Sequence, residues 1–204
     1  MPIQAIFWDV GGVLLSNAWD HDERLRALDH FHLDYEEFHA RHEMVVSSFE
    51  RGKISLDEYL GQTVFYKERP FTPDDFRNYM FSLSESKPEV LAFARALANS
   101  GEYLMATLNN ESRELNLYRL EKFKLREIFR LFFSSCFVGL RKPESAIYRL
   151  AIDTTQMRAE DCCFIDDRAL NLECAAALGM KTIQMKSLDQ LRAELQKLGV
   201  NARE

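Results

Sequence analysis

From residue 86 onward, apolar segments rich in β-forming residues alternate with segments of about ten residues in which apolar positions recur at helical spacing. The expected strands are residues 3–8, 103–108, 132–138, 162–165 and 182–185. The expected helices are residues 88–98, 111–123, 143–152, 168–178 and 187–198. Such alternation is typical of a parallel sheet that helices cover on both faces. We therefore predict an α/β fold.

The stretch between the first two expected strands has a different character. It is rich in histidine, acidic and aromatic residues, its apolar spacing is helical, and it contains no convincing strand. Capping motifs that begin at Ser55 and Thr72 mark two helix starts. We therefore expect two domains: an α/β core of residues 1–16 and 87–204, and a small all-helical insertion of residues 17–86.

The composition argues against several classes of partner. The net charge is -6, and an acidic protein repels the phosphate backbone of nucleic acids. No apolar stretch approaches the roughly 20 residues of a membrane-spanning helix, and no secretory segment opens the chain. The four cysteines match no zinc-binding spacing, so we expect reduced thiols. We predict a cytoplasmic monomer or homodimer without a nucleic-acid or membrane partner.

Polar residues gather where the expected strands end. In chain order these residues are Asp9, Asn109, Asn110, Lys142, Asp166 and Asp167. The carboxyl ends of parallel strands meet at one edge of a sheet, and ligands bind beyond that edge. We therefore expect three carboxylates, a lysine and two amides to converge there.

Three neighbouring carboxylates repel one another, and a divalent cation removes that repulsion. Such oxygen ligands suit Mg²⁺, which commonly shares a substrate phosphate. Lys142 would add a positive charge, and the strand-to-helix turns offer backbone N–H groups to an anion. A carboxylate such as Asp9 can act as a nucleophile and form an acyl phosphate. The pattern predicts a Mg²⁺ site that acts on a small phosphorylated molecule.

Each residue also has an ordinary structural explanation. A single Asp after a strand is commonly a turn residue, and Asp166 and Asp167 could both cap the next helix. The predicted position of all these polar residues at one edge of the sheet favours a functional site over separate structural roles. The five histidines all lie in the insertion, where His39 and His42 are three residues apart. Because no third metal ligand accompanies them, we expect solvated or half-buried side chains.

Four segments resemble the motifs of the haloacid dehalogenase superfamily. They are residues 6–14 (IFWDVGGVL), 106–112 (ATLNNES), 139–143 (GLRKP) and 164–167 (FIDD), the last followed by Asn171 and Gly179 at the family spacing. The resemblance covers most of the expected core. It implies a Rossmann-like sheet, and the insertion resembles the family's helical cap, which closes over the site and selects the substrate. The branch most similar to this chain is that of sugar-phosphate phosphatase-like proteins.

The resemblance implies roles for the matching residues. Asp9 would be the nucleophile, and Lys142 would hold it and the transferring phosphoryl group. Mg²⁺ would be bound by Asp9, the backbone carbonyl of Gly11, and Asp167. Asp166 would bind it directly or through water.

The resemblance also implies a phosphate-binding set. Gly11, Gly12 and Asn110 lie in the turns that would hold the phosphate. Asn109 stands at the position of the second motif where the family has Ser or Thr, and an amide can still donate to a phosphate oxygen. Thr107, two residues earlier, would restore the hydroxyl in an alternative alignment.

The first motif departs from the family pattern at Gly11. Phosphatases of the family usually have a second Asp there, which acts as general acid and base, although some sugar-phosphate phosphatase-like members also have Gly. Protonation of the leaving group would then fall to water or to an insertion residue. Asp20, His21 and Glu23 are candidates by their proximity in sequence.

These observations predict a metal-dependent hydrolase. The favoured function is a phosphatase of a small cytosolic phosphomonoester that works through an aspartyl-phosphate intermediate. A 2-haloacid dehalogenase is one alternative, although related dehalogenases have Ser and Asn where this chain has Asp166 and Asp167. A catalytically weak binding or regulatory member is another, suggested by Gly11 and Asn109.

Overall fold

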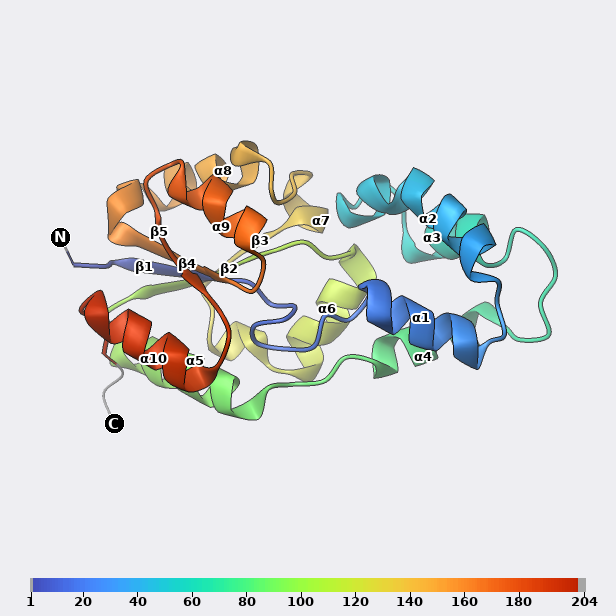
Figure 1. The fold of residues 1–204 in the computed structure, drawn as a ribbon, viewed down its shortest axis with the longest axis horizontal. Coiled ribbons are helices and arrows are strands. Elements are labelled where there is room, and N and C mark those ends of the chain that lie inside the picture. Colours follow the sequence, from blue (N-terminus) through green and yellow to red (C-terminus); the bar gives the residue numbers. More distant parts are fainter. Residues whose placement is uncertain (1, 202–204) are drawn as a thin grey trace.

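A five-stranded parallel sheet forms the centre of the computed structural model, which describes residues 2–201 (Figure 1). The strands are β1 (Ala5–Trp8), β2 (Leu104–Asn109), β3 (Leu131–Ser134), β4 (Cys162–Asp166) and β5 (Lys181–Gln184). Their order in space is β3-β2-β1-β4-β5, and every pair is parallel. The carboxyl ends of β1 and β4 therefore lie side by side at one edge.

The side chains of each strand alternate between two apolar layers. Trp8 of β1 belongs to one layer and Phe7 to the other. The adjacent cysteines of β4 follow the same rule, because Cys163 packs with Trp8 and Cys162 with Phe7. The two adjacent thiols therefore point towards opposite faces of the sheet.

Helices cover both layers and lie on opposite sides of the sheet in Figure 1. The layer of Trp8 is covered by α5 (Pro88–Ser100), α6 (Arg113–Lys122) and α10 (Leu188–Lys197). The layer of Phe7 is covered by α8 (Ser145–Thr155) and α9 (Ala169–Ala176). Short 3-10 turns, Leu125–Glu127 and Ala159–Asp161, precede β3 and β4. The predicted α/β fold is confirmed.

The predicted insertion contains four helices, which lie beyond the carboxyl ends of the strands (Figure 1). They are α1 (His21–His30), α2 (Tyr35–Glu50), α3 (Leu56–Thr63) and α4 (Pro73–Ser82). Side chains such as Trp19, Phe38 and Phe76 form an apolar cluster of their own there. Helices begin after Ser55 and Thr72, as predicted, and both residues form capping boxes. The division into two domains at these boundaries stays a prediction.

None of the helices within residues 2–201 has the length and apolar character that a membrane crossing requires.

The connections between the insertion and the core run side by side. Ser16 N donates to Glu85 O at 2.8 Å, and Ser16 Oγ donates to Leu83 O at 2.9 Å. From α6, the guanidinium of Arg119 donates to the Ser16 carbonyl at 2.5 Å. The connection is therefore held both by its own hydrogen bonds and by a cation from the core.

The strand expected over residues 132–138 was predicted too long. β3 ends at Ser134, and the chain turns into the single helical turn α7 (Ser135–Val138). The hydroxyl of Ser135 accepts from Glu111 N at 3.0 Å and donates to the last carbonyl of α2 at 2.6 Å. Hydrogen bonds to a loop and to the end of α2 thus replace strand pairing at Ser135, and the apolar sequence does not predict them.

The helix expected over residues 143–152 begins later. α8 starts at Ser145, with Glu144 as its extended N-cap residue, and it continues to Thr155. Pro143 follows a cis peptide bond and lies in the turn before the helix. A Pro at the first helical position and a Pro in the preceding turn look alike in sequence, so the pattern alone misplaced the start.

Candidate active site

Side chains that follow neighbouring strands meet at the carboxyl edge of the sheet. Lys142 is 2% exposed, and its Nζ lies 2.9 Å from Asp9 Oδ1 and 2.6 Å from Asp166 Oδ2. Asp9 directly follows β1, and Asp166 is the last residue of β4, which pairs with β1. The parallel register therefore brings the two carboxylates to one lysine. Three predicted site residues lie in a single buried cluster.

Asp167 completes a group of three carboxylates with Asp9 and Asp166. One oxygen of each lies within 4.8 Å of the others. The oxygens of Asp166 accept hydrogen bonds from Lys142 and Asn171. By contrast, Asp167 Oδ1 is buried and has no hydrogen-bond partner among residues 2–201. Asp167 therefore offers a ligand oxygen that the protein itself does not use.

The charges in this cluster are unbalanced. Burial raises the pKa of the Asp9 carboxyl to about 7, while the ion pair with Lys142 opposes the rise and Asp166 adds to it. Burial, together with Asp166, also raises the pKa of Asp167. One lysine does not neutralise three carboxylates, whereas a hard divalent cation would remove the excess charge. The donor set, with its one unpartnered oxygen, fits Mg²⁺.

Gly12 allows Asp167 to approach the turn after β1. Its φ is +73°, and a Cβ built on it would collide with the Asp167 carboxylate and lie 2.9 Å from Asn17 Oδ1. A side chain at this position would therefore meet both an unfavourable backbone conformation and a carboxylate of the cluster. By contrast, a Cβ on Gly11 would meet Asn17 Oδ1 at an ordinary 3.5 Å.

We expect Gly12→Ala to lower the free energy of unfolding by about 1–3 kcal/mol more than Gly101→Ala does. Gly101 is a matched control, because its φ is +69° and a Cβ there meets nothing within 4 Å. Urea unfolding of both variants measures the difference. Equal losses would show that the Asp167 carboxylate does not need this space.

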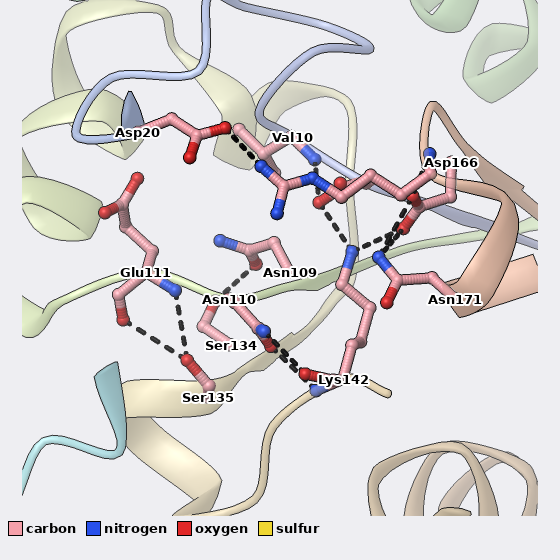
Figure 2. A network of polar contacts seen from close by, with 12 residues as sticks. Val10, Asp20, Asn109, Asn110, Glu111, Ser134, Ser135, Lys142, Asp166 and Asn171 are labelled. Carbon is pink, nitrogen blue, oxygen red and sulfur yellow. Dashed lines mark hydrogen bonds and ion pairs between the residues drawn. The ribbon is translucent and has the colours of Figure 1, made fainter. Parts of the chain in front are cut away.

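Two amides hold the charged groups in place (Figure 2). The side chain of Asn110 accepts from Lys142 N at 2.8 Å and donates to Lys142 O at 2.9 Å. Asn171 Nδ2 lies 3.1 and 3.0 Å from the two oxygens of Asp166. The side chain of Asn110, predicted to be part of a phosphate-binding turn, is thus used to position the lysine. Phosphate binding by its backbone N–H stays a prediction.

The two candidates for the second-motif position point into the protein interior. Asn109 donates to Asn116 Oδ1 at 3.2 Å and accepts from Ser134 Oγ at 2.9 Å. Thr107 is fully buried, and its hydroxyl has no partner among the described residues. The structure does not bring either side chain to the cavity beside Asp9. Their predicted roles stay predictions.

A cavity of about 220 Å³ lies between the carboxyl edge and the insertion helices. Its core side includes Asp9, Gly11, Asn110 and Lys142. Its insertion side includes Trp19, Asp20, Arg24, His42 and Phe49. Charged, uncharged polar and aromatic groups therefore all face the space next to Asp9.

Ion pairs cross this cavity from the core to the insertion. Arg141 lies 2.9 Å from Glu50 at the end of α2, and Arg168, directly after Asp167, pairs with Asp20. All four paired residues line the cavity. The entrance is therefore bordered by guanidinium groups whose charge is already partly matched by carboxylates.

Comparison with known proteins assigns the family. The family model described as haloacid dehalogenase-like hydrolase matches residues 3–179. The chain belongs to the haloacid dehalogenase-like hydrolases. It is therefore an enzyme of a hydrolase family, as predicted, and the match includes all the predicted site residues.

The proteins similar to this chain include a curated plant protein. Flavin mononucleotide hydrolase 1 of Arabidopsis thaliana is 29% identical over 165 residues, which are 79% of this chain and 65% of the plant protein. The alignment thus spans slightly under two thirds of that relative. A second relative, bifunctional epoxide hydrolase 2 of Rattus norvegicus, is 30% identical over 60% of this chain and 23% of its own length.

Solved structures share the fold. A HAD family enzyme from Bacteroides thetaiotaomicron, in complex with magnesium and inorganic phosphate, has a TM-score of 0.77 at 20% identity, covering 91% of this chain and 96% of that chain.

Because this chain has Gly11 where the resemblance implies a second Asp, another group must protonate the leaving group. Of the insertion residues predicted for it, Asp20 lines the cavity, whereas His21 and Glu23 do not. Glu50 and Glu111, which were not predicted as site residues, also line the cavity. Burial raises the pKa of both carboxyls. Glu111 lies within the second motif, a signal that was available, whereas no local pattern marks Glu50.

Proposed function

We propose that this haloacid dehalogenase-like hydrolase is a Mg²⁺-dependent phosphatase of a small phosphomonoester. The proposal rests on one observation: Asp9, Asp166 and Asp167 converge beside Lys142 at the edge of a cavity. The similar proteins include a flavin mononucleotide hydrolase and a HAD family enzyme in complex with magnesium and inorganic phosphate, and both support the proposal.

Mg²⁺ would be held by Asp9, Asp167 and the Gly11 carbonyl, with Asp166 as a direct or water-mediated ligand. When bound, it supplies positive charge that neutralises the carboxylates and the phosphate oxygens. Lys142 neutralises Asp9 and Asp166 from the side of the third motif. The side chain of Asn110 keeps Lys142 in place by hydrogen bonds to the backbone N–H and the carbonyl of Lys142.

The proposed reaction has two steps. A carboxylate oxygen of Asp9 forms a bond to phosphorus as the bond to the leaving oxygen breaks, and the alcohol takes a proton from water or from a cavity carboxyl. Water then attacks the phosphorus of the aspartyl phosphate, which restores the Asp9 carboxylate and releases inorganic phosphate. Positioning and charge supply most of the rate enhancement in such reactions.

The insertion helices α1–α4 are proposed to act as the cap. The segment before α1 contributes Trp19 to the cavity, α1 contributes Arg24, and α2 contributes His42 and Glu50, so a substrate beside Asp9 would contact the insertion. The substrate's identity would then be decided by insertion residues, whereas the reaction would be carried out by residues of the sheet edge.

The test is a panel of phosphomonoesters, including 4-nitrophenyl phosphate and flavin mononucleotide, assayed with Mg²⁺ and with EDTA. We expect turnover of at least one ester that EDTA removes and Mg²⁺ restores. L-2-chloropropionate is assayed in parallel, because a dehalogenase also has a similar fold, with a TM-score of 0.65. Chloride release that persists in EDTA, without ester hydrolysis, would contradict the proposal.

A further inference from the structure

One cavity residue has no part in the proposed phosphoryl transfer, although its hydrogen bonding is well defined. His42 lies on α2, is 2% exposed and lines the cavity. Its ring stacks on Phe38 at 5.9 Å, and its Nδ1 lies 2.7 Å from the hydroxyl of Tyr59. No group of potential metal ligands among the described residues includes it.

A chain of hydrogen bonds fixes which nitrogen of His42 carries a proton. The indole N–H of Trp19 can only donate, and it lies 3.0 Å from the Tyr59 hydroxyl, which therefore accepts. Tyr59 must place its own proton elsewhere, and His42 Nδ1, at 2.7 Å, is nearer to its hydroxyl than Trp19 is, while the side chain of Thr63 also interacts with that hydroxyl. Nδ1 thus accepts. In a neutral imidazole the proton then resides on Nε2.

The surroundings keep this ring uncharged. Burial lowers the pKa of His42 to about 3, and the nearby guanidinium of Arg24 and the ring of His39 lower it too, while Asp20 opposes them. Since Nδ1 is occupied by Tyr59 and one ring face by Phe38, the opposite edge of the ring with Nε2–H remains for the cavity. Nε2 is not among the buried polar atoms that lack a partner, so it is not sealed within the protein.

We propose that His42 is a specificity-determining residue whose Nε2–H donates a hydrogen bond to an uncharged oxygen, a hydroxyl or carbonyl, on the leaving group of the substrate. This inference rests on the proposed phosphatase function. It assigns the substrate class as phosphomonoesters of oxygen-rich alcohols. The arginines and carboxylates around the cavity suit charged groups, whereas the uncharged His42 donor recognises an acceptor oxygen without a salt bridge.

The first test is the protonation of the ring. Long-range ¹⁵N–¹H NMR of the histidines at pH 7 should show His42 as the neutral Nε2–H tautomer. In Tyr59→Phe this preference should weaken, because the phenol that donates to Nδ1 is gone, while the stacking of residue 59 on Phe49 remains possible. An imidazolium or an Nδ1–H tautomer in the wild type would overturn the inference.

The second test compares two esters that differ in acceptor oxygens, glycerol 1-phosphate and n-propyl phosphate. We expect wild type to prefer the glycerol ester over n-propyl phosphate in kcat/KM, and we expect His42→Phe to reduce that preference about fivefold to tenfold. His42→Gln, whose amide nitrogen lies near the Nε2 position, should retain part of the preference. His30→Phe is the control, because His30 stacks on Tyr79 and does not line the cavity.

The outcomes separate the inference from the proposed function. If wild type has no preference, or if His42→Phe lowers turnover of both esters equally, the inference is wrong while the phosphatase stands. If wild type hydrolyses no phosphomonoester at all, the proposed function fails, the substrate contact fails with it, and the NMR result decides the tautomer alone.

Discussion

Asp9→Asn is expected to lower kcat for phosphomonoester hydrolysis by at least about 10³-fold while leaving the fold intact. The amide is nearly isosteric, and Lys142 keeps Asp166 as its ion-pair partner, so the loss would be chemical rather than structural. Removal of a nucleophile commonly costs several orders of magnitude. Steady-state kinetics with a saturating ester and Mg²⁺ measures the effect, and thermal unfolding confirms that the variant is folded.

Asp153→Asn serves as the control for this variant, because Asp153 is an exposed acid on α8, away from the cavity. It should retain wild-type turnover. If Asp9→Asn kept turnover within about tenfold of wild type, Asp9 would not be the nucleophile, and the reaction would need a different attacking group.

Arg119→Met is expected to have the largest effect on stability, a loss of about 3–5 kcal/mol in the free energy of unfolding. Arg119 is buried, lies 2.6 Å from Glu111 Oε2 and also donates to the Ser16 carbonyl. Its removal would leave Glu111 as an uncompensated buried carboxylate at the point where the insertion joins the core. Urea unfolding monitored by circular dichroism provides the measurement.

The double variant Arg119→Met/Glu111→Gln isolates the cause of this loss. It should recover most of the stability, because no unpaired charge stays buried. Arg95→Met is the comparison on the surface: its ion pair with Glu127 is exposed, and the expected change is below about 1 kcal/mol. A loss below 1 kcal/mol for Arg119→Met would show that the buried pair does not stabilise the junction.

The central residues of the candidate site could be predicted because parallel strands place their carboxyl ends side by side at one edge of the sheet. Asp9 and Asp166 are far apart in sequence, but each marks the end of a buried apolar run, and parallel pairing of β1 with β4 brings such ends together. The same reasoning placed Lys142 nearby, and the structure shows it in contact with both carboxylates. To predict that these residues meet, it was therefore enough to identify the strands correctly.

The other half of the cavity could not be predicted in this way. Arg168 pairs with Asp20, 148 positions earlier, and Arg119 reaches Ser16 across 103 positions. Such contacts depend on how the insertion helices sit over the sheet, which no local pattern encodes. His42 shows the same limit: its helix was predicted, but its burial and its bond to Tyr59 arise from the packing of α2 against α3.

The predicted end of β3 was wrong for a related reason. The apolar run continues through Phe137 and Val138, so the pattern extends the strand. The strand instead ends at Ser134, whose hydroxyl donates to Asn109 Oδ1 of β2, and the hydroxyl of Ser135 donates to the last carbonyl of α2. Hydrogen bonding by short polar side chains competes with strand pairing, and its partners are visible only in three dimensions.

Titration calorimetry with Mg²⁺ most directly tests the claim that Asp9, Asp166 and Asp167 form a cation site. Wild type is predicted to bind Mg²⁺ at a single saturable site, and Asp167→Asn should weaken that affinity at least about tenfold, since its Oδ1 is the oxygen that the protein leaves without a partner. Wild-type protein that takes up no Mg²⁺ at millimolar concentration, or an Asp167→Asn variant with unchanged affinity, would contradict the account.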